Sequence, residues 1–205
     1  MDVKIYCIPT NCFVIIPTFN YTEQDLMTKK IIESYKKLLK PQDYSKKPTI
    51  DGVKIFELKN FVSDDGFLCE VARLDEKGNL EGQEGFKFRQ INFTKVMPGS
   101  IKAWHLHFNQ TDLWYVPPDG YLSVGLVDLR ANSSTKEVRM RSVLGAGKSQ
   151  MILIPSGVAH GYANFTQDPL YVFYFVNQQF NSETPDEGRL PWDLFGKDFW
   201  EITPG

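Results

Sequence analysis

From Gly52 to Asn177 the sequence is a series of short β-type runs separated by turn residues, and this pattern restricts the fold more than any other feature. The runs are rich in β-branched and aromatic residues, and glycine, proline, aspartate and asparagine cluster between them. In order, they are VKIFEL, FLCEVARL, FKFRQINF, IKAWHLHF, DLWYV, YLSVGLVDL, KEVRMRSVL, QMILIP and LYVFYFVN. Since no helical segment separates them, the pattern predicts an all-β antiparallel sandwich or barrel, not a parallel α/β sheet.

The first 50 residues differ because they contain a segment with helical spacing. Thr22 is a suitable N-cap, and apolar residues follow at helical intervals up to Leu39. Pro41 ends the pattern, since proline disfavours a helical conformation in the residue before it. We therefore predict an N-terminal extension over residues 1–50, with one helix from Thr22 to Lys40, and a β domain over residues 51–205. The extension is expected to pack on the core or on a partner subunit.

Composition excludes several classes of partner. The 205 residues carry a formal charge of −2, without the basic excess that nucleic-acid binding requires. No apolar run approaches the roughly 20 residues that cross a bilayer, so we expect no membrane association. The three cysteines are an odd number, which favours a reduced, cytoplasmic protein.

The three histidines of the chain fall in two β-type segments. His105 and His107 are two residues apart in IKAWHLHF, so strand alternation predicts that both imidazoles face one side. With Gly99 before them and Asp112 after them, they resemble the first signature motif of the cupin superfamily. The segment PSGVAHGYAN, which contains His160, resembles the second. This resemblance implies a double-stranded β-helix, or jelly roll, in which the histidines converge inside the barrel mouth.

Three imidazoles and one carboxylate form a mixed nitrogen and oxygen ligand set. Such a set suits Zn, Fe, Mn, Ni or Cu. The proposed ligands of one divalent transition metal are His105, His107, Asp112 and His160. In the alternative interpretation these groups are hydrogen-bonded polar residues of a β core.

The stretch from Phe67 to Trp200 also resembles one cupin family, the dTDP-4-dehydrorhamnose 3,5-epimerases. Five segments carry the likeness in the family's order: DGFLCE, FRQIN, GSIKAWH, VDLRANSST and IPSGVAHGY. Glu187-Gly188 and Trp192-Asp193 echo a late family motif. The resemblance implies an isomerase that removes protons next to the C4 ketone of a nucleotide-linked 4-keto-6-deoxy sugar. It also implies a homodimer that uses no organic cofactor.

The resemblance further implies roles for individual residues. His105 matches the family's base, and Lys102 stands where an arginine near the substrate could stabilise the enolate. The matches around the nucleotide and sugar are Glu70, Gln90, Asn92 and His160. Phe173 stands at the position of the family's acid tyrosine, so we assign the acid to Tyr171, which shares its strand face. Tyr174 lies one register step away.

Several positions depart from the family pattern. Asp65 replaces an arginine that faces phosphate, and no aspartate follows Trp200 to orient the base. The lysine that follows the base strand in the family has no counterpart, because Asp112-Leu113-Trp114 occupies that area. His107 is additional, and it completes the metal-type pair. A divalent metal that polarises the ketone would reconcile these departures with epimerase chemistry. Two alternatives stay open: a metal-dependent cupin enzyme acting on another small polar molecule, and a catalytically degenerate protein that binds a sugar nucleotide.

Overall fold

The computed structural model describes residues 3–6, 14–17, 31–42, 44–45, 47–83 and 85–202. The chain divides into two compact units, Met1–Ser45 and Lys46–Gly205. The predicted packing of the extension on the core stays a prediction. Within the described residues no helix is long and apolar enough to cross a membrane.

The N-terminal unit contains one antiparallel strand pair and one short helix. Strand β1 (Val3–Tyr6) pairs with β2 (Val14–Pro17), and α2 spans Glu33–Lys36. The part of the predicted helix from Thr22 to residue 30 lies outside the described residues. Over residues 31–40 the prediction was too long, because only one helical turn forms. This turn has no side-chain N-cap and buries no residue, and short helices without tertiary packing are marginal.

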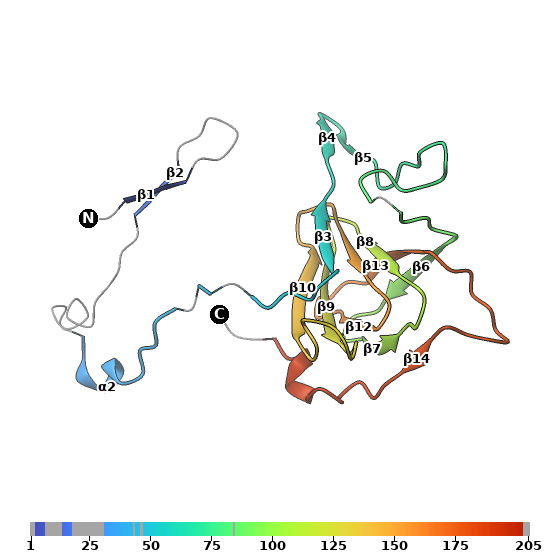
Figure 1. The fold of residues 1–205 in the computed structure, drawn as a ribbon. Coiled ribbons are helices and arrows are strands. Elements are labelled where there is room, and N and C mark those ends of the chain that lie inside the picture. Colours follow the sequence, from blue (N-terminus) through green and yellow to red (C-terminus); the bar gives the residue numbers. More distant parts are fainter. Residues whose placement is uncertain are drawn as a thin grey trace. The chain divides into compact units, whose positions relative to one another are not determined.

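The second unit is built from two five-stranded antiparallel sheets, which Figure 1 shows as a barrel-like sandwich. The first sheet has the order β10 (Arg139–Gly145), β9 (Tyr121–Asp128), β12 (Val158–Ala163), β7 (Ile101–Leu106) and β14 (Gly188–Arg189). The second has the order β3 (Lys54–Glu57), β11 (Gln150–Ile154), β8 (Asp112–Val116), β13 (Leu170–Val176) and β6 (Gln90–Val96). A separate hairpin joins β4 (Asn60–Ser63) and β5 (Gly66–Cys69). The predicted all-β jelly roll is confirmed.

The main core lies between the two sheets and takes alternate residues from each strand. On β12, Val158 and Tyr162 belong to this core, whereas Ala159 and Ala163 belong to a cluster on the outer face of the first sheet. On β8, Trp114 and Val116 point inward. Complete burial of an aliphatic side chain contributes roughly 1.5–3 kcal/mol. The same alternation sends Asp112 and His160 toward the interior.

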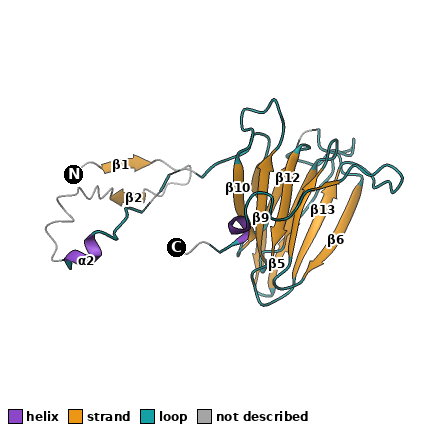
Figure 2. Ribbon diagram, turned by 90° about the horizontal axis from the view of Figure 1, so that it is seen from below, coloured by secondary structure: helices purple, strands orange, loops and turns teal. Residues whose placement is uncertain are grey.

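The outer cluster forms where the C-terminal segment packs on the first sheet. Figure 2 shows the 3-10 helix η1 (Lys197–Trp200) beside β9 and β10. Trp104 packs against Phe199 and Trp200 with ring centroids 4.9 Å apart in both cases. The indole N–H groups of Trp104 and Trp200 both donate to the Trp192 carbonyl. These contacts fix the chain segment that carries β14 against β7.

Candidate active site

A cavity of about 780 Å³ opens between the two sheets. Its volume lies in the usual range for small-molecule sites. Strands β6, β7, β8, β12 and β13 contribute to its wall, together with the segment over residues 178–187. Among the lining residues are most of those named from the sequence: Gln90, Asn92, Lys102, His105, His107, Asp112 and His160.

Pairing of β7 with β12 brings two of the histidines together. The register places His160 opposite His105, and the two imidazole centroids are 6.0 Å apart. His107 lies one residue beyond the end of β7, and its ring centroid is 5.2 Å from that of His160. The three rings therefore lie around one cavity, as the sequence motifs predicted.

His105 is held by a carboxylate that the sequence analysis did not assign to the site. Its Nδ1 lies 2.9 Å from an Oε1 of Glu187, which also accepts from Nε of Arg189. Glu187 reaches this position because β14, the next element, pairs with β7 and sets Arg189 opposite His105. Burial, with a smaller contribution from the charge of Arg189, lowers the pKa of His105 to about 4, so its imidazole is neutral at neutral pH.

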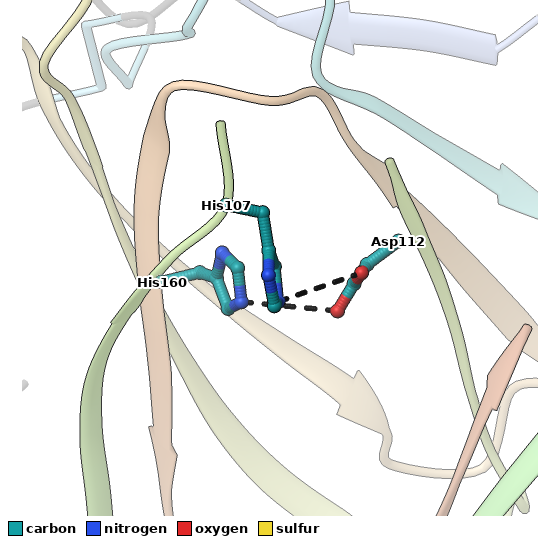
Figure 3. A group of neighbouring side chains, drawn as sticks. All are labelled: His107, Asp112 and His160. Carbon is teal, nitrogen blue, oxygen red and sulfur yellow. Dashed lines mark ion pairs between the residues drawn. The ribbon is translucent and has the colours of Figure 1, made fainter. Parts of the chain in front are cut away.

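The other two histidines lie beside Asp112, as Figure 3 shows. The Nε2 atoms of His107 and His160 are 3.9 Å and 3.8 Å from the two carboxylate oxygens of Asp112. All three side chains are buried. Trp114 donates to one Asp112 oxygen, and the amide of Gln110 lies 2.8 Å from the other and 3.2 Å from His107 Nε2. Burial lowers the pKa of His160.

The cavity contains two tyrosines, and neither is the one expected. Tyr174 donates to the Tyr162 hydroxyl at 2.7 Å, and both line the cavity. Burial raises the pKa of Tyr174, which keeps the phenol protonated. The expected placement of Tyr171 was wrong: it is exposed outside the lining and stacks on Phe93. The error is one step of register, because the face of β13 that carries Phe173 points away from the cavity.

Glu70 also lies apart from the cavity lining of the single chain. It is exposed beyond β5 and forms an ion pair with Arg73 at 2.6 Å. Lys102 is the only lysine or arginine among the residues described around the cavity.

One wall of the cavity is a loop without regular structure over residues 178–187. The Asp186 carboxylate accepts hydrogen bonds from three consecutive backbone amides, those of residues 108–110. The backbone amide of Phe180 donates to the Gln90 side chain. Amide side chains predominate on this wall and beside it, namely Gln178, Gln179, Asn181, Asn109 and Gln110. Apart from the carboxylates of Asp186 and Glu187, which bind to the barrel, this wall therefore offers hydrogen bonds instead of charge to a ligand.

The chain matches one family model and two curated relatives over the region that forms this cavity. The sequence model described as dTDP-4-dehydrorhamnose 3,5-epimerase matches residues 47–194. The spore coat polysaccharide biosynthesis protein SpsL of Bacillus subtilis is 42% identical over 144 residues, which cover 70% of this chain and 91% of SpsL. The probable low-salt glycan biosynthesis epimerase Agl13 of Haloferax volcanii is 28% identical over 147 residues, or 71% of this chain and 90% of Agl13.

Solved structures agree with the sequence matches. The dTDP-4-dehydrorhamnose 3,5-epimerase of Bacillus anthracis, with TDP and PPi bound, superposes with a TM-score of 0.62 at 26% identity. The match covers 78% of this chain and 91% of that one. The matched region spans the whole barrel and every histidine of the cavity. The chain therefore belongs to the dTDP-4-dehydrorhamnose 3,5-epimerase family.

Proposed function

We propose that this protein epimerises a nucleotide-linked 4-keto-6-deoxy sugar by removing protons next to the C4 ketone and returning them on the opposite face. Family membership and the relatives named as epimerases support the reaction class. The single observation that carries the proposal is the contact between His105 and Glu187 inside a cavity large enough for a sugar nucleotide.

His105 serves as the base in this proposal. A carboxylate accepts hydrogen bonds, so the 2.9 Å contact with Glu187 puts the imidazole proton on Nδ1 and leaves the lone pair on Nε2. When Nε2 takes a proton from the sugar, the negative charge of Glu187 stabilises the imidazolium that forms. Glu187 is thus a positioning residue for the base.

Tyr174 is our candidate for the proton donor. Its hydroxyl lines the cavity and is protonated, and it donates to the Tyr162 hydroxyl at 2.7 Å, so the O–H must turn from Tyr162 to the sugar for proton transfer. Lys102 is the cation that would stabilise the enolate oxygen or a phosphate. Gln90 and Asn92 line the cavity on β6, where their amides can bind the sugar or the nucleotide.

We further propose that the protein works as a homodimer in the cytoplasm. Strand β6 is an edge strand of its sheet, and its outer face exposes Ile91 and Phe93 beside Tyr171. The β4–β5 hairpin exposes a second apolar group: Phe61, Val62, Phe67 and Leu68. Contiguous exposed apolar residues of this kind mark interaction surfaces. Light scattering on the wild type and on Phe93→Glu tests this, and a monomeric wild type would refute it.

Solvent exchange tests the reaction directly. The protein is incubated in D2O with dTDP-, UDP- and GDP-linked 4-keto-6-deoxy sugars, and NMR follows the protons at C3 and C5. We expect exchange with at least one sugar nucleotide, complete loss in His105→Ala, and normal exchange in Tyr171→Phe, whose side chain lies outside the cavity lining. Tight binding of a sugar nucleotide without any exchange would refute the epimerase and favour a binding protein.

A further inference from the structure

We infer that His107, Asp112 and His160 form a three-ligand site for a divalent transition metal at the buried end of the cavity, and that His105 is not a ligand. Together they offer two imidazole nitrogens and a carboxylate oxygen, all within 4.8 Å of one another. The four-ligand set expected from the sequence thereby becomes a set of three.

The backbone fixes which nitrogen of each histidine is available. Nδ1 of His107 contacts the carbonyl oxygen of Asp186, and Nδ1 of His160 lies 3.0 Å from the carbonyl oxygen of Val158. A carbonyl oxygen can only accept, so the proton of each neutral ring resides on Nδ1. Both Nε2 atoms consequently carry lone pairs. Histidines that bind metals usually show this arrangement, with the second ring nitrogen donating to a carbonyl or carboxylate.

The Nε2 atoms of both histidines face the carboxylate of Asp112, and the dashed lines in Figure 3 join each of them to one of its oxygens. Separations of 3.9 Å and 3.8 Å between Nε2 and oxygen are too long for hydrogen bonds. A metal with bonds of about 2.0–2.2 Å holds its ligand atoms roughly 3–4 Å apart, close to these distances. The amide of Gln110 and the indole of Trp114 offset part of the repulsion among these buried acceptors, and a cation between them would remove the rest.

Neighbouring side chains position the carboxylate. Trp114 donates to Oδ2 of Asp112 at 3.0 Å, which restricts the rotation of the carboxyl group. The Gln110 amide lies between Oδ1 of Asp112 and Nε2 of His107. This amide is the competitor of a metal, because its N–H group engages the lone pair that a metal would use. A substitution that removes the Gln110 amide should leave Asp112 and His107 available to a metal.

His105 is separated from the set by its own partner. Its Nδ1 is engaged by Glu187, and its ring centroid lies 6.0 Å from that of His160, compared with 5.2 Å for His107. Strand alternation does not extend to His107, since β7 ends at Leu106 and the contact with Asp186 sets the ring instead. His105 therefore belongs to the proposed base with Glu187, and His107 belongs to the proposed metal site.

Two imidazoles and one carboxylate suit Zn, Fe, Mn, Ni or Cu, and they leave coordination positions open. A metal held there supplies a Lewis acid that can polarise a substrate carbonyl. This catalytic use rests on the proposed function, but binding of the metal does not. The two ideas can fail separately, because metal binding is measured without any sugar nucleotide.

The test is a titration of the chelator-treated full-length protein with Co²⁺, whose visible absorption reports coordination, followed by competition with Zn²⁺. We expect one metal per chain. His107→Ala and His160→Ala should lose the visible absorption bands of bound Co²⁺. His105→Ala should keep these bands and should still bind one metal per chain. Gln110→Ala is the matched control: it removes the neighbouring amide but no ligand, and should bind as tightly as the wild type or more tightly. Circular dichroism checks the fold of each variant.

A second measurement uses the wild type alone, in case a buried variant fails to fold. In the Co²⁺ protein, the Nδ1 protons of bound histidines give strongly shifted exchangeable NMR signals. Two such signals would support the inference. Three signals, loss of binding in His105→Ala, or a wild type that binds no Co²⁺ or Zn²⁺ would overturn it.

Discussion

The strongest test of the proposed base is Glu187→Gln. The substitution keeps the shape of the side chain and removes the charge that faces Nδ1 of His105 at 2.9 Å. A hydrogen bond to a charged group contributes about 1.5–3 kcal/mol. If that contribution is realised only when the imidazolium forms, the rate of proton abstraction should fall roughly 10- to 150-fold, because about 1.4 kcal/mol corresponds to a factor of ten.

The assay is the initial rate of deuterium incorporation at the sugar, measured across substrate concentrations. We expect kcat to fall while KM stays nearly constant, because Glu187 acts through His105 and not on the ground state of the substrate. Glu187→Asp should recover part of the loss by restoring the charge. Arg189→Gln is the control, since it removes the exposed partner of the same carboxylate oxygen and should cost less than about fivefold. A Glu187→Gln protein with an unchanged kcat, alongside an inactive His105→Ala, would refute the reasoning.

Three further predictions concern the donor and the scaffold. Tyr174→Phe should slow exchange by about 10²–10⁴-fold, as expected for loss of a general acid, whereas Tyr171→Phe should not; equal rates in the two variants would contradict our placement of the acid. In Gly125→Ala, the new Cβ would lie 2.5 Å from the Phe199 ring, so thermal unfolding should reveal a loss of about 1–3 kcal/mol; an unchanged unfolding temperature would count against this packing. Asp128→Asn should cost about 1.5–3 kcal/mol in urea unfolding at pH 7, because it removes the charge and one acceptor oxygen of a fully buried carboxylate that binds arginine, serine and threonine side chains. The arginine holds the pKa of Asp128 well below its usual range, so this contribution is complete above the unfolded pKa of about 3.9 and is lost as the pH falls below it; a penalty that stays constant from pH 7 to pH 2 would be evidence against this role.

The sequence predicted the barrel well because its signals are local. Alternating apolar residues and turn residues define each strand, and the pairing of β7 with β12 then follows from the jelly-roll order. The grouping of His105, His107 and His160 was predicted for the same reason. Their metal and substrate roles remain predictions.

Other parts of the site depend on information that local patterns do not contain. Tyr171 was chosen by the face of Phe173, and an error of one residue in the register of β13 exchanges the two faces of the strand. Glu187 was missed as the partner of His105 because the two residues are 82 positions apart and meet only through the short pairing of β14 with β7. Over residues 31–40, the described part of the proposed helix, the pattern was suitable, but propensity alone does not stabilise a helix whose residues are not buried.

Within the loop over residues 178–187, the stretch over residues 178–185 carries none of the groups that we propose for proton transfer, whereas Glu187 at its end contacts His105. The loop supplies one wall of the cavity, and it is attached to the barrel mainly through Asp186 and Phe180. An exchange of residues 178–185 between relatives can therefore redirect the enzyme toward a different sugar or nucleotide while the proton-transfer groups stay where they are. Chimeric proteins that switch this stretch are a practical route to new substrate preferences.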